Sequence, residues 1–441
     1  MRNLGMGQSK LPATWGIDRL VHMDTPTSTR RDYNLVRFLG RFATVPTFLI
    51  LAFLLLAQAN QQPVIPGIEV LLSERLNLIR AKRVGLITNH SGVNRKLRHD
   101  IDLLASAAGV KLTALFSPEH GIRGAAQAGE KIRSTVDAKT GVPIHSLYAE
   151  TRRPTPEMLN DIDVLVYDIQ DIGTRFYTYI STLGECMQAA AERKIPLIVL
   201  DRPNPLGGDT LEGPLLNPVF RSFVGAFAIP IRYGLTPGEL AGWIKSNLKL
   251  DLELSIVKMK HWTRAQWYEE TDLIWVPPSP NIPTLASAMV YPGMCLIEGT
   301  NLSEGRGTTT PFEIVGAPWV DGLKLAERLN AQKLGGVLFR PVAFTPTLSK
   351  FSGEACQGVQ LHVADRKSFR ALPTALVIIE DVRSNYPDQF QFKSAHFDRL
   401  AGTDAVRKAM ERNEPVGEIV ATWQKDLKEF DTVRRKFLLY P

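Results

Sequence analysis

The chain has 441 residues, of which 44% are hydrophobic and 22% charged, values that exclude a disordered or collagen-like protein. This length is sufficient for two or three domains. The net charge of +7 is uneven, because seven Lys and Arg against three Asp and Glu fall within the first 59 residues. The small excess that remains on the other residues excludes a nucleic-acid partner. Three cysteines, with no Cys-x-x-Cys pair, exclude a disulfide scaffold and give no zinc motif.

The N-terminal segment is typical of a secretory signal. Four arginines between positions 30 and 41 precede an apolar run at 45–57, with small residues at Ala57 and Ala59. The run is shorter than the roughly 20 residues of a membrane-spanning helix. We therefore predict a signal peptide over residues 1–59, export to the periplasm or the extracellular space, and no stable membrane insertion after cleavage. An uncleaved membrane anchor is the alternative.

The chain after the signal begins with a pattern of alternating strands and helices. Short, continuously apolar runs predict strands covered on both faces. They lie at residues 84–88, 112–116, 164–168 and 197–201. Helix-like segments at 97–108 and 177–193 are long enough to connect parallel strands. This alternation predicts an α/β fold with a parallel sheet in a first domain over residues 64–286.

The composition and the pattern of apolar residues change after Thr284. A proline-rich stretch at 276–283 predicts an extended connection. Beyond it, apolar runs at 289–297 and 375–380 are β-like, and an amphipathic helix is predicted over 416–428. We therefore expect a smaller α+β auxiliary domain over residues 287–441.

Polar clusters follow each of the four predicted strands. They read TNHSG (88–92), SPEHGIRG (117–124), DIQDIGTR (168–175) and DRPNPLGG (201–208). Because the carboxyl ends of parallel strands share one edge of a sheet, we expect these loops to meet at one ligand-binding cleft. Four ordinary turns are the alternative. The cluster EGTNLSEGRGT (298–308) is expected to form the wall of that cleft from the second domain, with a solvated loop as its alternative.

Several reaction classes lack their motifs in this sequence. No G-x-G-x-x-G follows the first strand, and no G-x-x-x-x-G-K-[ST] phosphate loop occurs. The G-x-S-x-G of serine hydrolases and the H-E-x-x-H of zinc peptidases are also absent. A metal site would have to combine His90, Glu119, His120 and Asp168 without a known ligand spacing. We predict neither a metal nor a cofactor.

Carboxylates and arginines remain as the groups that carry the chemistry. Glu119 follows a strand end, and Glu130, Asp168 and Asp171 are expected to reach the same space. Glycoside hydrolysis uses one carboxyl as the acid to the leaving oxygen and commonly a second carboxylate, unless a 2-acetamido group of the sugar is the nucleophile. Arginines in these clusters provide bidentate donors for an anionic substituent on the sugar, although a structural ion pair is the alternative for each.

At these clusters the sequence resembles the NamZ (YbbC-like) exo-β-N-acetylmuramidases of bacterial cell-wall recycling. The motifs that carry the resemblance are GLITNHSG (85–92), LFSPEHGIRG (115–124), VYDIQDIGTRFYTY (166–179), LDRPNPLGG (200–208), YGLTPGELA (233–241), PPSPNIPT (277–284) and YPGMCLIEGTNLSEGRGTTTPFEIVGAPW (291–319). The resemblance covers residues 64–441. It implies a Rossmann-like N-terminal domain and an auxiliary C-terminal domain, with the site in the cleft between them. It also implies the release of β-1,4-linked N-acetylmuramic acid from the non-reducing end of peptidoglycan fragments.

The resemblance also implies roles for individual residues. Glu119, in SPEHG, is the first choice for the general acid; Glu130 is the second catalytic carboxylate and Asp168 the third candidate. The predicted substrate-binding residues are Asn89, His90, His120, Arg123, Gln170, Arg175, Tyr177, Arg202, Asn204, Asn281, Asn301, Glu304 and Arg306. The expected partners are peptidoglycan-derived muramyl saccharides. The alternatives are a non-catalytic peptidoglycan-binding or assembly protein of the envelope, and a metal-dependent hydrolase of a wall component.

Overall fold

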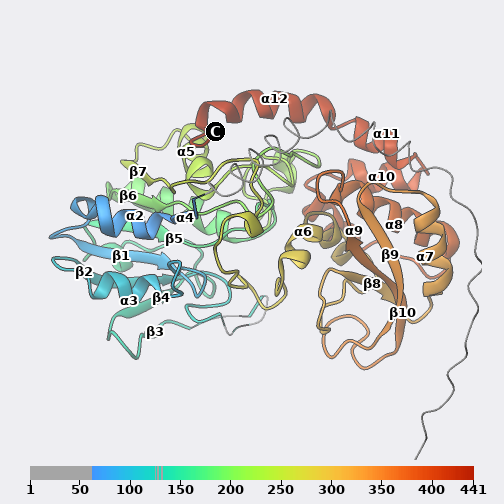
Figure 1. The fold of residues 1–441 in the computed structure, drawn as a ribbon, viewed down its shortest axis with the longest axis horizontal. Coiled ribbons are helices and arrows are strands. Elements are labelled where there is room, and N and C mark those ends of the chain that lie inside the picture. Colours follow the sequence, from blue (N-terminus) through green and yellow to red (C-terminus); the bar gives the residue numbers. More distant parts are fainter. Residues whose placement is uncertain (1–61, 125, 127–128, 131–132) are drawn as a thin grey trace, which may run out of the picture. The chain divides into compact units, whose positions relative to one another are not determined.

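The computed structural model describes residues 62–124, 126, 129–130 and 133–441, and Gln62–Pro441 form one compact unit (Figure 1). The predicted signal peptide lies outside the described residues. Within the described ranges, none of the helices combines the length and the apolar character needed to cross a membrane.

A mostly parallel sheet forms the first domain, as predicted. Its seven strands among the described residues run in the order β3-β4-β2-β1-β5-β6-β7, and the β3–β4 pair is antiparallel. The strands are β1 (Arg83–Thr88), β2 (Lys111–Ser117), β3 (Thr135–Val136), β4 (Pro143–Ser146), β5 (Val164–Asp168), β6 (Leu197–Leu200) and β7 (Leu254–Val257). The four predicted runs are β1, β2, β5 and β6, which are neighbours in the sheet, so their carboxyl ends do share one edge.

Helices cover both faces of this sheet because the strands are apolar on both sides. On one face, α2 (Gly67–Glu74) and α3 (Asp100–Ala105) share an apolar core with strand residues such as Leu86. On the other, α4 (Tyr179–Arg193) and α5 (Pro237–Asn247) share a core with Ile87, the next residue along β1. Successive side chains of a strand point to opposite faces of the sheet, so one apolar run contributes side chains to two hydrophobic cores.

The second domain is a smaller α+β unit, also as predicted. Its antiparallel sheet has the order β8-β10-β9. The strands are β8 (Ile314–Ala317), β9 (Val337–Phe344) and β10 (Cys356–Val363). The helices are α6 (Leu285–Met294), α7 (Gly322–Ala331), α8 (Ala371–Asn385), α9 (Ser394–Ala401), α10 (Ala405–Glu411), α11 (Val416–Ala421) and α12 (Gln424–Arg434).

Three expectations for this part of the chain were wrong in detail. The run 289–297 is helical, in α6 and a following 3₁₀ turn, and the run 375–380 lies inside α8. Both helices are buried against each other, so their apolar residues show no amphipathic period that would separate them from strands. The predicted helix at 416–428 is two helices, α11 and α12, interrupted at Thr422 and Trp423. The domain boundary near residue 286 falls in the first turn of α6 and stays a prediction.

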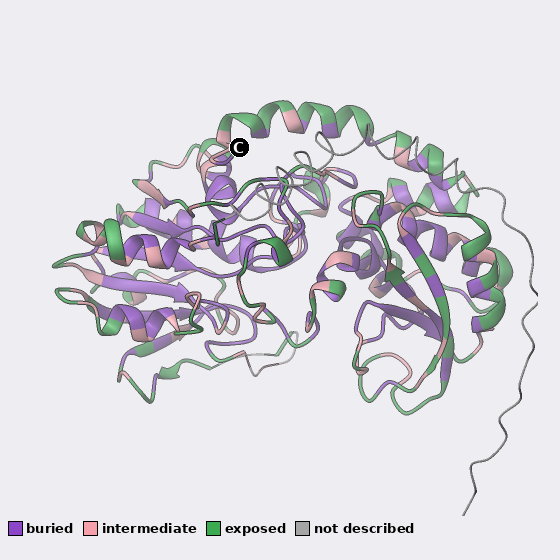
Figure 2. Cartoon of the chain, viewed as in Figure 1, coloured by how far each residue is buried: buried purple, intermediate pink, exposed green. Residues whose placement is uncertain are grey.

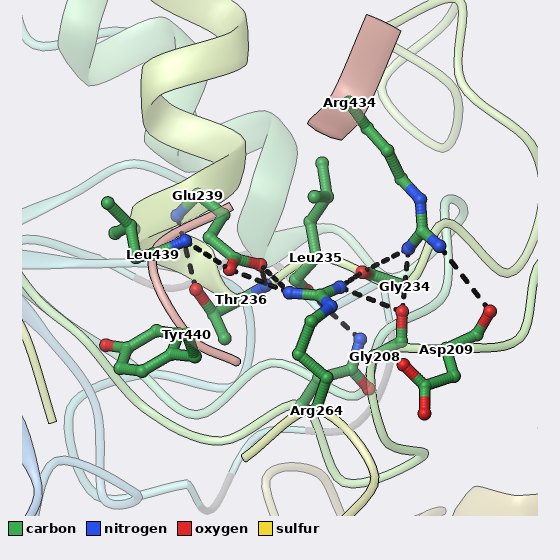
Figure 3. Close-up of polar contacts among 12 residues, drawn as sticks. Gly208, Asp209, Gly234, Leu235, Thr236, Glu239, Arg264, Arg434, Leu439 and Tyr440 are labelled. Atoms are coloured by element: carbon green, nitrogen blue, oxygen red, sulfur yellow. Dashed lines mark hydrogen bonds and ion pairs between the residues drawn. The ribbon is translucent and has the colours of Figure 1, made fainter. Parts of the chain in front are cut away.

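The C-terminal segment returns from the second domain to the first through α12 (Figure 1). Only one side of α12 is buried, through Leu427, Phe430 and Arg434 (Figure 2). Arg434 and Arg264 both donate hydrogen bonds to the carbonyl oxygens of Gly208 and Gly234 (Figure 3). The last turn of α12 is thereby held against the first domain.

Glu239 completes this attachment. Its carboxylate accepts hydrogen bonds from the Arg264 guanidinium at 2.7 and 2.8 Å and from the backbone N–H of Leu439 at 2.9 Å (Figure 3). Nearby, the Tyr440 hydroxyl donates to Asp201 Oδ2 at 2.6 Å and accepts from the N–H of Met259 at 2.9 Å. Two successive residues of the C-terminus therefore bond to buried acids of the first domain.

Tyr440→Phe is expected to lower the free energy of unfolding by about 1–3 kcal/mol, because it leaves a buried carboxylate oxygen and a buried N–H with one partner fewer. Urea denaturation followed by tryptophan fluorescence measures the change. An unaltered midpoint would show that the C-terminal attachment does not contribute to stability.

Candidate active site

Three of the four polar loops pack against one another at the carboxyl edge of the sheet. The N–H of Gln170 donates to Ser91 Oγ at 3.0 Å, which joins the loop after β5 to the loop after β1. Arg202, after β6, donates to Asp168 Oδ1 at 2.5 Å and to the carbonyl of Val93 at 2.9 Å. Buried polar groups require partners, and these loops supply many of them to one another, although Asp168 Oδ2 and Gln170 Oε1 accept no hydrogen bond from the described residues. The expected single cleft is therefore not formed by all four loops.

Several predicted site residues belong to this buried network. Asp168 is fully buried, and burial raises its pKa to about 6 against the opposing effect of Arg202. Gln170 donates its amide to two carbonyls, and Asn204 Nδ2 donates to the carbonyl of Leu235 at 3.0 Å. Asn89 Oδ1 accepts from the Ser91 backbone and hydroxyl. These side chains hold the loops together and do not line the two chambers described below.

Glu119 lies in the fourth loop, after β2, and its carboxyl faces a different space. Its Oε1 accepts from the N–H of Gly129 at 2.9 Å, and its Oε2 accepts from Thr178 Oγ1 at 2.6 Å. The Tyr148 hydroxyl also contacts it, and burial together with the charge of Glu119 raises the pKa of Tyr148 to about 12. Donors from three separate segments thus fix the orientation of this one carboxyl.

Glu119 lines a cavity of about 290 Å³ between segments of both domains. Aromatic rings form much of its wall, with Tyr291 in edge contact with Phe176 at 5.3 Å and with Phe312 at 4.7 Å between ring centroids. The predicted residues Tyr177, His120 and Asn281 also line it. Burial lowers the pKa of His120, whose Nδ1 lies 2.8 Å from the carbonyl of Ala126. The inner chamber, as we call this cavity, combines an aromatic wall with several polar and charged side chains. Concave sites with convergent polar groups are typical of ligand binding.

A second, larger cavity of about 890 Å³ borders the inner chamber, and we call it the outer chamber. The two chambers share Asn281, Glu298, Arg306 and His396. Although burial opposes ionisation of Glu298, the Arg306 guanidinium 2.7 Å away and the nearby His396 lower its pKa to about 2.

The floor of the outer chamber contains a second ion pair. Lys350 Nζ lies 3.0 Å from Glu304 Oε2 and donates to two backbone carbonyls. Glu304 also contacts Arg306 at 3.5 Å. Three residues of the cluster at 298–308, Glu298, Glu304 and Arg306, therefore line the outer chamber.

The remaining predicted site residues do not line either chamber. Arg175 is fully buried and donates to four backbone carbonyls, and Arg123 pairs with Asp137 at 2.7 Å. His90 Nε2 is 2.7 Å from the carbonyl of Pro277, and burial lowers the pKa of its imidazole. Asn301 exchanges two hydrogen bonds with the backbone of residues 389 and 391.

Glu130 is exposed and directly follows Gly129, the backbone donor to Glu119. It is not among the residues that line the two chambers. The catalytic roles of Glu130 and Asp168 stay predictions.

Sequence reasoning missed several residues of the chambers. Thr178 and Glu298 lie inside motifs that carry the family resemblance, close to residues that were predicted to belong to the site. This proximity was the available signal. Tyr148, Lys350 and His396 stand in unremarkable sequence and reach the cavity only through tertiary packing.

The described residues contain no group of three or more His, Cys, Asp and Glu side chains that is arranged to hold a metal ion. Two of the conceivable metal ligands, His90 and His120, face backbone carbonyls instead. The three cysteines, Cys186, Cys295 and Cys356, are unpaired and buried.

The fold and the chambers define a two-domain α/β protein with an oriented carboxyl in a cavity that both domains line. The chain belongs to the exo-β-N-acetylmuramidase NamZ family, since residues 84–286 match the N-terminal and residues 289–440 the C-terminal family model. This confirms the resemblance seen in the sequence.

Individual relatives agree with this membership. The peptidoglycan β-N-acetylmuramidase NamZ of Bacillus subtilis is 50% identical over 383 residues, which are 87% of this chain and 92% of that protein. Crystal structures of two DUF1343 family proteins of Bacteroides fragilis are also similar. One has a TM-score of 0.81 at 42% identity and the other 0.72 at 33%, each over 86% of this chain and 99% of its own.

Proposed function

We propose that this protein releases β-1,4-linked N-acetylmuramic acid from the non-reducing end of peptidoglycan fragments, in cell-wall turnover and recycling. It is a glycosidase of the NamZ family, and the 50% identical relative is a peptidoglycan β-N-acetylmuramidase. The observation that carries the proposal is the carboxyl of Glu119, held by Gly129 and Thr178 in an inner chamber of about 290 Å³.

The two chambers support action at a chain end. The inner chamber is near the lower limit of small-molecule sites and suits one sugar unit, whereas the outer chamber of about 890 Å³ has room for the remainder of the glycan. We infer that the terminal muramic acid occupies the inner chamber and that the scissile bond lies close to Glu119.

In this arrangement Glu119 donates its proton to the glycosidic oxygen as the bond from that oxygen to C1 breaks. Water supplies the hydroxyl that finally bonds to C1, and its remaining proton restores the carboxyl. Thr178 and the N–H of Gly129 hold the carboxyl in place before the reaction, and the aromatic wall limits the access of bulk water.

The test is incubation of the purified protein with a disaccharide that carries muramic acid at its non-reducing end. Mass spectrometry is expected to detect free N-acetylmuramic acid and the shortened sugar. A non-catalytic wall-binding protein would bind the disaccharide and leave it intact, which would refute the proposal.

EDTA is expected to leave this activity unchanged, because proton transfer from Glu119 requires no metal ion. The measurement compares initial rates before and after dialysis against the chelator. Loss of activity that Zn²⁺ or Mn²⁺ restores would favour the metal-dependent hydrolase instead.

We also propose that the mature enzyme is exported. The basic segment, the apolar run at 45–57 and the small residues at Ala57 and Ala59 support this proposal. N-terminal sequencing of the exported protein is expected to begin at Asn60, whereas an intact N-terminus on a membrane-bound protein would indicate an uncleaved anchor.

A further inference from the structure

The arginines that the sequence offered for an anionic substrate are already engaged within the protein. Arg123 pairs with Asp137, Arg202 with Asp168, and Arg306 with Glu298. Arg175 is buried among four backbone carbonyls. N-acetylmuramic acid carries a lactyl carboxylate, and a carboxylate in a partly enclosed site requires a cationic partner.

Arg152 has a different environment from these four. Its guanidinium carbon lies 4.5 Å from the ring centroid of Tyr148 and 4.0 Å from that of Phe223. The residue is exposed, and the ion pairs of the described residues give it no carboxylate partner. Contact with two rings restricts the position of a guanidinium and leaves N–H groups at its edge available to a carboxylate.

The position of Arg152 links it to the inner chamber. Tyr148 lines that chamber, and its hydroxyl contacts both Glu119 and Arg152. Phe223, the second ring in contact with the guanidinium, precedes Val224, which is also part of the chamber wall. Arg152 itself is not among the residues that line the chamber, and a single tyrosine separates its guanidinium from the carboxyl of Glu119.

We propose that Arg152 binds the lactyl carboxylate of the terminal N-acetylmuramic acid and makes the enzyme select sugars in which that carboxylate is free. This assignment rests on the proposed function. A planar guanidinium binds a carboxylate through two parallel hydrogen bonds, and an amide in its place cannot accept both. An uncharged lactyl group would therefore leave Arg152 without its anion and bind less well.

The experiment compares two chromogenic β-N-acetylmuramides, one with the free lactyl carboxylate and one with its primary amide. The wild type is expected to prefer the free acid. Arg152→Ala is expected to lower kcat/KM on the acid by about 10- to 100-fold, chiefly through KM, with little effect on the amide. The preference for the acid should then nearly disappear. Because both substrates are measured on one preparation, partial unfolding of the variant does not alter the ratio.

Arg153→Ala is the matched control. Arg153 is the next residue in the chain, but its guanidinium is paired with Glu185 at 2.7 Å and Glu192 at 2.9 Å. This variant is expected to keep the wild-type preference. Arg152→Lys retains the charge without the planar fork and should retain only part of the preference.

An unchanged preference in Arg152→Ala would overturn the assignment. So would loss of the preference in Lys393→Ala, because Lys393 is the cation of the outer chamber without a carboxylate partner among the described ion pairs. If the wild type hydrolyses neither substrate, the proposed function fails instead. Calorimetric binding of free N-acetylmuramic acid then tests Arg152 separately, with weaker binding expected only in Arg152→Ala and not in Arg153→Ala.

Discussion

Replacing Glu119 with Gln is expected to lower kcat by about 10²- to 10⁴-fold while substrate binding is largely retained. The amide has nearly the shape of the carboxyl, and its oxygen can still accept a hydrogen bond from Gly129 or Thr178. It cannot donate a proton to the glycosidic oxygen. Single-turnover release of N-acetylmuramic acid measures the chemical step, and calorimetry with the uncleaved disaccharide measures binding.

Matched carboxylate variants separate a catalytic effect from a structural one. Glu130→Gln changes an exposed residue, so any loss of kcat without a change in thermal unfolding would assign it a catalytic role. Asp168→Asn removes the charge opposite the buried Arg202 and is expected to destabilise the protein before it affects chemistry. Wild-type turnover in Glu119→Gln would contradict the proposed mechanism.

The parallel sheet and the position of Glu119 could be predicted because their causes are local in the sequence. Each strand buried on both faces gives a continuous apolar run, and the residue after such a run must lie at the carboxyl edge of the sheet. Thr88, Asp168 and Glu119 were placed by this rule at or just past the strand ends, where the structure has them.

The rule did not predict which polar residues would face a ligand. Asp168 and Arg202 carry the same chemical groups as Glu119 and Arg152, yet they neutralise each other under the loops. Whether a charged side chain faces another protein group or an open cavity depends on the distance between chain segments, which a single sequence does not contain. The same limit applies to His396, which reaches the chambers from α9, more than 200 residues after Glu119.

The two buried helices of the second domain illustrate a related limit. An amphipathic period arises only where one side of a helix meets water. In α8, residues Ala375–Ile379 are all buried, so the sequence there resembles a strand buried on both faces. Length and capping distinguish the two, and for α6 the signal was Thr284, whose hydroxyl accepts from the N–H of Ser287.

Replacing Arg175 with Met is expected to lower the free energy of unfolding by about 3–5 kcal/mol, the range for removing one side of a buried charged interaction. Its guanidinium donates to the carbonyls of Pro214 and Ile229 at 2.8 and 2.9 Å, and to those of Leu400 and Ala401 at 3.0 and 2.7 Å. Methionine fills much of the volume but leaves all four oxygens without this donor. Urea denaturation measures the loss, and Arg340→Ala, at an exposed arginine of β9, is expected to change stability by less than about 0.5 kcal/mol.

The effect of Arg175→Met should extend to activity, because two of these carbonyls end α9. A cation at the C-terminus of a helix offsets the partial negative charge of its last carbonyls, and burial lowers the pKa of Arg175 to about 9, so it stays charged at neutral pH. His396 and Leu400, both on α9, line the inner chamber. Loosening this helix should raise KM even where the variant remains folded. Full stability together with full activity in Arg175→Met would show that α9 is positioned by its other contacts alone.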